Sequence, residues 1–235
     1  MKKKMMASLL VGSAVVGASL APLSAQATTT GNTPVQVEFG GGVLPDHDNS
    51  LGDGDGNMDP DPSTSNKDFD LLTIPKSFNF PLSKIGEDLS SIKESSTAYR
   101  AVMVGDVRGT KEGWHVTGEI VEMSNGTDKL DGEISFGLKP YYAVYNDEAK
   151  IYDSLANLNG INIASDSTAP SFSGTSMKIG GGATTLMTAS IGTGQGTWSG
   201  VFKDTSLNVT TPYQQIKAGA YTGNITWNLV VGPSI

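Results

Sequence analysis

The chain has 235 residues with a net charge of −8, 37% apolar residues and no cysteine. These totals exclude a disulfide-stapled protein, a thiolate cluster and a bundle of membrane spans, and they fit one domain with an arm. The acidic balance also makes nucleic acid and anionic lipid poor partners, because a phosphate backbone must be neutralised by clustered lysine and arginine.

The N-terminus has the order of a secretory signal peptide. Three lysines, Lys2 to Lys4, precede an apolar stretch, and small residues stand three and one before a cleavage point after Ala27. An uncleaved membrane anchor is the alternative, but glycine, serine and proline dilute the apolar stretch. We therefore expect a signal peptide at 1–27 and a secreted chain with 13 basic and 24 acidic residues, a charge of −11.

Residues 28–67 are expected to form an N-terminal arm. Val35, Val37 and Phe39 alternate with polar residues and predict one short strand, which three glycines close. Leu44 to Asp68 is dense in Asp, Gly, Pro, Asn and Ser, which predicts a solvated, acidic linker.

The linker contains an incomplete calcium motif. Asp53, Asp55, Asn57 and Asp59 alternate as oxygen ligands of a calcium loop would. Two positions depart from the pattern, however: Met58 replaces the turn glycine and Thr64 replaces the bidentate glutamate. A plain acidic linker is the alternative, and no cofactor is expected.

Short runs with a period of two fill residues 68–235 and predict an all-β domain. The expected strands are 99–106, 114–122, 133–138, 141–145, 160–164, 185–191, 197–202, 206–209 and 221–231. Asn125-Gly126 and Asn159-Gly160 predict tight turns. Residues 83–94 and 148–158 carry only weak helical signals, so we expect an antiparallel β-sandwich of many short strands.

Two of these strands each pair a tryptophan with an aliphatic residue two positions on. Trp114 and Val116 share one face of the first strand, and Trp227 and Leu229 share one face of the last. Core packing and an exposed binding platform both fit this spacing. A third tryptophan, Trp198, lies outside these pairs and is expected in the core.

The order of these motifs resembles the WxL-domain surface proteins of Gram-positive bacteria, which are named for two Trp-x-Leu motifs. The matching segments are "LLTIPKSFNF", "AVMVGDVRGTKEGWHV", "GQGTWSGVF" and "YTGNITWNLVVGP". The last is the most specific, with Tyr221, Trp227 and Leu229 at the family's spacing. The first motif departs from the pattern, because Val116 stands where the family has leucine.

The resemblance implies a β-rich domain over 68–235 that binds peptidoglycan or another cell-wall polymer non-covalently. The motif residues are then Trp114, Val116, Tyr221, Trp227 and Leu229. It also implies assembly with a membrane-anchored companion or with other WxL proteins, so a non-catalytic assembly subunit is the alternative function. The chain has no cysteine for a lipid and no sortase-type signal, which agrees with non-covalent attachment at the cell surface.

Catalysis is not expected. The chain offers no cysteine nucleophile and only two histidines, His47 and His115, which is too few for a typical zinc hydrolase. Carboxylates near Glu119 to Glu133 are more often solvated surface than a glycosidase pair. Asp106 and Arg108, two apart on one strand, share a face and could pair with each other or with neighbours; they are expected to orient the turn before Gly113, and ligand binding is the alternative.

Overall fold

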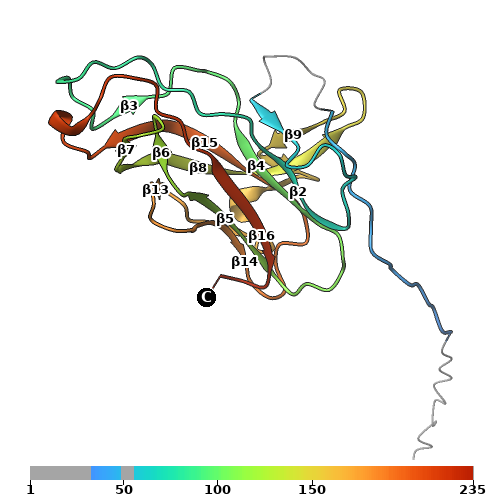
Figure 1. Cartoon of the computed structure of the whole chain (residues 1–235). Helices are drawn as coiled ribbons and strands as arrows, with labels where there is room; N and C mark the ends of the chain where they lie inside the picture. Colours follow the sequence, from blue (N-terminus) through green and yellow to red (C-terminus); the bar gives the residue numbers. More distant parts are fainter. Residues whose placement is uncertain (1–32, 49–55, 235) are drawn as a thin grey trace, which may run out of the picture. The chain divides into compact units, whose positions relative to one another are not determined.

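In the described part of the protein, residues 33–48 and 56–234 of a computed structural model, nearly all regular secondary structure is β-strand (Figure 1). Its only helical elements are two 3-10 turns, η1 (Ile163–Ser165) and η2 (Tyr213–Gln215). Neither turn has the length or the apolar character that a membrane crossing requires. Met1–Glu38 and Phe39–Ile235 form two separate units, and the expected signal peptide lies outside the described residues.

The larger sheet has eight strands, and every pair in it is antiparallel. Its order is β1-β2-β4-β15-β8-β13, while β3 pairs with β15 and β9 pairs with β8. Figure 1 shows the two longest strands, β8 and β15, side by side. The bounds are β1 Asn57–Met58, β2 Phe69–Pro75, β3 Ile92–Lys93, β4 Ala101–Asp106, β8 Gly132–Asn146, β9 Ile151–Leu155, β13 Ser176–Lys178 and β15 Gly196–Val209.

The smaller sheet has the order β12-β14-β5-β16 and is also antiparallel. Its bounds are β5 Trp114–Ile120, β12 Ser171–Phe172, β14 Thr184–Ala189 and β16 Ile225–Val231. β5 lies at its centre, and β16 forms one edge. Two hairpins complete the described strands, one of β6 (Met123–Ser124) and β7 (Lys129–Leu130) and one of β10 (Asn157–Leu158) and β11 (Ile161–Asn162).

The main core lies between the two sheets. Val102 and Val104 of β4 meet the tryptophan strand β5 there. A second cluster covers the outer face of the larger sheet, where Met103 packs with Tyr152 of β9. Because both of its faces are covered, all six residues of β4 are buried, whereas β5 alternates between buried and half-buried positions.

The predicted antiparallel sandwich is confirmed, but several expected strands are longer than their sequence signals. The segments 133–138 and 141–145 form the single strand β8, which tolerates Pro140 because no described strand pairs with it there on the side away from β15. In β15 a bulge at Asp204, with φ of 52°, joins the segments 197–202 and 206–209. Asn159 and Gly160 form the predicted turn, with φ of 51° and 81°.

Neither of the two weak helical signals gives a helix, as the all-β prediction requires. Residues 83–94 contain no helix and end in β3, and residues 148–158 contain β9 and β10. The free side of β8 offers β9 a complete set of backbone partners, and Tyr152 packs edge to face on Tyr145 with ring centroids 5.1 Å apart. Tertiary pairing therefore overrides a marginal local helix preference.

The strand predicted at Val35, Val37 and Phe39 is also wrong. These residues have no regular secondary structure, and their side chains are 90%, 74% and 88% exposed. Their alternation is typical of a strand, but no described strand pairs with them, and a strand needs a neighbour to satisfy its backbone.

The prediction of a solvated linker agrees with the exposed residues 60–65, but it is wrong for Leu44, His47, Asn57 and Asp59, which are buried. Leu44 is buried in the outer cluster beside Gly105, and the Tyr152 hydroxyl donates to the Pro45 carbonyl oxygen at 2.7 Å. Further along, β1 adds a two-residue strand to β2. One leucine and a few backbone bonds are thus enough to hold a polar segment against the domain.

Candidate functional site

The residues of the first motif, Trp114 and Val116, lie fully buried on β5. The Trp114 indole N–H donates to the Gly194 carbonyl oxygen at 3.0 Å, and the Trp198 indole of β15 donates to the same oxygen at 2.9 Å. A single carbonyl therefore joins indoles from both sheets and closes this end of the sandwich. Trp198 is a core residue as predicted, and in the folded state Trp114 presents no surface to a ligand.

Trp227, in the second motif, has a different environment. It lies on the edge strand β16 directly opposite Gly118 of β5 and is only half-buried. Its ring points inward to Phe202 of β15, with centroids 6.0 Å apart in an edge-to-face arrangement. A Cβ atom on Gly118 would lie 3.5 Å from this ring, an ordinary contact distance, but only 2.7 Å from the Met177 sulfur. Trp227 therefore faces the gap between the sheets.

A groove of about 970 Å³ opens between the sheets at the end away from Gly194. Trp114 begins β5 and Ile120 ends it, and only Ile120 lines the groove. The volume is in the range of ligand sites, and the lining is mainly apolar. Its apolar side chains include Phe78, Phe80, Ile92, Ile120, Ile134, Leu207, Val209, Ile225 and Trp227.

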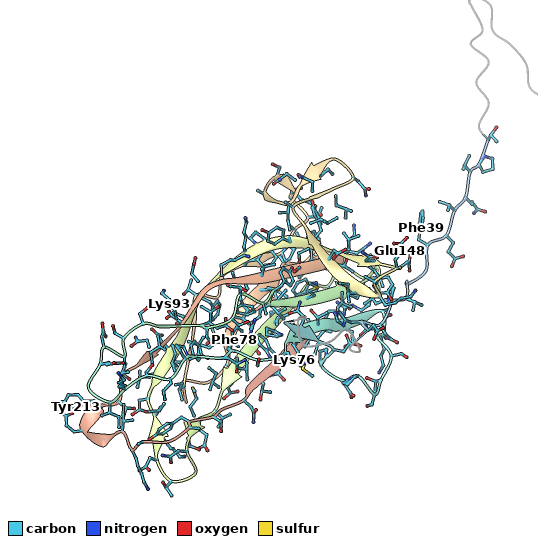
Figure 2. All side chains as sticks on the ribbon, turned by 90° about the horizontal axis from the view of Figure 1, so that it is seen from above. Phe39, Lys76, Phe78, Lys93, Glu148 and Tyr213 are labelled. Carbon is cyan, nitrogen blue, oxygen red and sulfur yellow. The ribbon has the colours of Figure 1, made fainter. Side chains whose placement is uncertain are left out.

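One wall of the groove is the irregular segment 76–92, which Arg100 holds in place. The buried guanidinium pairs with Glu94 at 2.9 Å, donates to the Ala98 carbonyl at 2.9 Å, and also donates to the carbonyl oxygen of Ser77. It lies 5.8 Å from the centroid of the Phe78 ring. Burial raises the pKa of Glu94 and the charge of Arg100 opposes that rise. Figure 2 labels Lys76 and Phe78, which follow directly on β2.

The opposite wall contains Tyr221, the other groove-lining residue of the second motif. Its hydroxyl donates to the Lys217 carbonyl at 3.1 Å and accepts from the Lys217 amide at 3.2 Å, which closes a short loop. Thr222 exchanges two backbone bonds of 2.9 Å with Ser124. Leu229 of the same motif is half-buried against the core and does not line the groove.

Among the described residues, the charged side chains that line the groove are those of Lys76, Lys84 and Lys217, with no aspartate or glutamate beside them. Glu87 lies 3.9 Å from Lys84 at the exposed rim. The pKa of Asp128 is lowered, first by a hydrogen bond from Thr127 and also by the charge of Lys217. On a chain of net charge −8 the groove is a locally basic, apolar place.

The predicted pair of Asp106 and Arg108 is confirmed. The guanidinium donates to both carboxylate oxygens at 2.9 Å, contacts Glu112 at 3.3 Å and stacks on Phe69 at 3.8 Å from the ring centroid. The hydrogen bonds to Asp106 raise the pKa of Arg108. This pair fixes the connection between β4 and β5 and does not line the groove.

The calcium motif is not assembled in the described residues. Asp53 and Asp55 lie outside them, and the Asn57 side-chain oxygen accepts a 2.8 Å bond from the Ala101 amide. Asp59 is buried, and this burial, with the nearby charge of Asp46, raises its pKa to about 7. Within the described ranges no three His, Cys, Asp or Glu side chains form a metal-ligand group, and a calcium loop stays only the weaker alternative to an acidic linker.

Sequence reasoning did not find most of the groove. Residues 76–92 and 216–220 of its walls have almost no strand periodicity, and 83–94 carried only a weak helix signal. The strand expected over 221–231 begins only at Ile225, so Tyr221, which the motif identified, lies in the irregular part of the second wall. One signal in the sequence could have identified the first wall. Phe78 and Phe80 lie close together in the segment "LLTIPKSFNF", which also resembles the WxL family.

A two-layer β-domain with an apolar groove at one end has the architecture of a binding module. The chain matches the family described as WxL domain, surface cell wall-binding, over residues 26–233. It therefore belongs to the WxL family, a family of the cell wall and cell surface. No curated protein and no solved structure matches the chain significantly.

Proposed function

We propose that this protein attaches non-covalently to peptidoglycan and that the wall polymer enters the groove beside Trp227. The family is described as cell wall-binding. The observation that supports the groove as the site is the placement of Trp227 and Tyr221, two residues of the more specific motif, in its lining. Trp114 and Val116 then serve the fold, because both are fully buried.

The chemistry of the groove suits this polymer. Sugar rings present C–H faces that pack on aromatic rings, and the peptides of peptidoglycan carry carboxylates. The apolar lining with Trp227 and Tyr221 supplies the first kind of contact, and Lys76, Lys84 and Lys217 supply positive charge for the second. Binding is proposed without catalysis, so incubation with the protein releases no soluble wall fragments.

Cosedimentation with purified, protein-free peptidoglycan tests the proposal. Leu82 and Ile85 line the groove and are exposed, so Leu82→Glu with Ile85→Glu changes the site with little effect on the fold. The parent is expected in the pellet, and the double variant in the supernatant with an unchanged melting temperature.

The matched control is Ile191→Glu, a change of an exposed isoleucine that does not line the groove. It should sediment like the parent. Equal sedimentation of the groove variant and the parent would rule the groove out as the binding site.

Docking on a membrane-anchored companion or another WxL protein is the second candidate, because an apolar groove also accepts a peptide segment. In that case stripped walls do not retain the protein, whereas walls that carry the companion do. The parent protein on bare peptidoglycan separates the two cases, since only the second predicts that it stays in the supernatant.

A further inference from the structure

The edge strand β16 presents unpaired backbone groups that can be identified one by one. The Gly232 amide donates to the Gly113 carbonyl at 3.0 Å, and these residues continue the register in which Val231 lies opposite Trp114. Bonding alternates along an antiparallel pair, so even-numbered residues of β16 bond to β5 and odd-numbered residues face away. The backbone N–H and C=O groups that face the free edge are those of Ile225, Trp227, Leu229 and Val231.

This edge lacks the features that usually prevent strand addition. Residues 221–234 contain no charged side chain, and Pro233 comes only after the strand has ended. At the end of the strand, Val230 and Val231 are both exposed. Natural edge strands are normally protected by lysine, proline, a bulge or a covering segment. No described strand other than β5 pairs with β16.

The same chain carries a segment, residues 34–39, that has the alternation of a strand but no neighbouring strand in the described part of the structure. Val35, Val37 and Phe39 alternate with polar residues, have no strand partner among the described residues, and are 90%, 74% and 88% exposed. The segment can be followed in Figure 2, where Phe39 is labelled. Proline at position 34 suits the first residue of a strand. Soluble proteins seldom leave such a row of apolar side chains without a use.

Two molecules of this protein repel each other least where residues 33–37 of one meet residues 221–234 of the other. Two copies of a chain with net charge −8 repel each other over most of their surfaces. Residues 33–37 and 221–234 contain no charge, and Glu38 is the one acidic residue within the donor segment. Self-association therefore meets least repulsion where the exposed apolar segment lies against the exposed edge.

We propose that residues 34–39 of one molecule add as an antiparallel strand to the free edge of β16 in a second molecule. The added backbone pairs with Ile225, Trp227, Leu229 and Val231, and Val35, Val37 and Phe39 continue the inward row formed by Ile225, Trp227 and Leu229. Each molecule has one donor and one acceptor, so the exchange gives a closed dimer or an open chain of copies. Ile225 and Trp227 also line the groove, so the added strand lies beside the proposed wall-binding site, although the assembly itself does not require wall binding.

Sedimentation velocity over a concentration series, on the protein beginning at Thr28, tests the assembly. The parent is expected to form dimers or longer species as concentration rises. Val35→Asp with Val37→Asp places charge in the buried row and should raise the dissociation constant at least about tenfold. Gln36→Asp, which puts a single negative charge on the opposite face of the segment, is the control and should assemble nearly as well as the parent, and Val35→Asp alone provides the comparison at equal charge.

The acceptor edge is tested by hydrogen exchange and by Val231→Pro. The amides of the odd-numbered residues 225 to 231 should exchange slowly only at high concentration, whereas the even-numbered amides are protected at every concentration. Val231→Pro removes an amide that faces away from β5, so its bonds to β5 remain and the thermal transition should stay cooperative. Assembly should fall to the level of the Val35→Asp, Val37→Asp variant.

Three results would overturn the proposal. The first is a parent protein that stays monomeric at all concentrations, and the second is a Val35→Asp, Val37→Asp variant that assembles as the parent does. The third is protection of the odd-numbered amides in the monomer, which would place the added strand within one chain. A monomeric arm variant that still sediments with peptidoglycan leaves the groove proposal intact, so the two proposals fail independently.

Discussion

At the scale of single residues, Gly194 closes one end of the sandwich. Its carbonyl accepts two indole N–H groups, and its φ of 77° lies in the left-handed region. A Cβ atom there would lie 2.2 Å from the Cβ of Ala189 and 2.8 Å from the indole nitrogen of Trp114. Both the backbone conformation and the space therefore require glycine.

Gly194→Ala should lower the free energy of unfolding by about 2–4 kcal/mol, through overpacking and left-handed strain together. Gly192→Ala is the matched control: its φ is 90°, but nothing lies near the added methyl group. That change should cost only about 1 kcal/mol. Urea unfolding measures both, and equal losses would show that the packing around Gly194 contributes little.

Asp59 should make stability depend on pH. Its pKa is raised from 3.8 to about 7 in the folded protein, mainly by burial and also by the charges of Asp46 and Asp70, against a hydrogen bond from the His47 backbone. The folded state therefore binds more protons than the unfolded state between these two values, and stability falls as pH rises through that window.

Asp59→Asn removes this titration. The variant should be more stable than the parent by about 1–3 kcal/mol near pH 8 and nearly equal to it near pH 4. Urea unfolding at both pH values measures the difference. The same difference at both pH values would mean that Asp59 does not titrate with a raised pKa.

At the scale of elements, the two motif strands have different roles because they occupy different places in one sheet. β5 is central, with neighbours on both sides, so Trp114 is buried among side chains of both sheets. β16 pairs only with β5, so Trp227 keeps part of its surface open to the groove. The same spacing of a tryptophan and an aliphatic residue thus yields a core tryptophan in one strand and a groove-lining tryptophan in the other.

Phenylalanine substitutions separate these roles. Trp114→Phe removes the bond to Gly194 and part of a fully packed ring, so it should cost about 2–4 kcal/mol of stability. Trp227→Phe should cost about 1 kcal/mol but weaken cosedimentation with peptidoglycan. Thermal unfolding and the cosedimentation assay measure the two effects, and a large stability loss with intact wall binding in Trp227→Phe would reverse the assignment.

At the scale of the whole molecule, net charge opposes binding to an anionic wall while the groove lysines favour it locally. The secreted form is expected to carry a charge of −11, and the repulsion acts over long distances in dilute salt. Contacts inside the groove are short and are screened less.

Wall binding should therefore strengthen as salt rises to about 0.1 M, where the screening length is about 10 Å. Lys76→Glu should weaken binding at every salt concentration, because it reverses a charge that lines the groove. Cosedimentation across a salt series measures both, and parent binding that falls steadily with salt would show that attraction dominates.

Much of the fold could be predicted from the sequence because period-two alternation is a local property. The positions of β4, β5, β14 and β16 follow it closely. The strand β9 and the Leu44 contact could not be predicted in this way, because each exists only through a partner distant in the chain, β8 for the first and Gly105 for the second. The expected strand at Val35 to Phe39 shows the converse, a local pattern for which the described residues offer no partner.

The sequence by itself determined the all-β class, the two Trp strands and the WxL resemblance, since these depend on residue order and spacing. Only the tertiary structure decided that Trp114 is buried and that Trp227 lines a groove. The physical reason is that a strand's periodicity fixes which side chains share a face, whereas burial depends on whether that strand lies at the centre or the edge of its sheet and on which segments cover it.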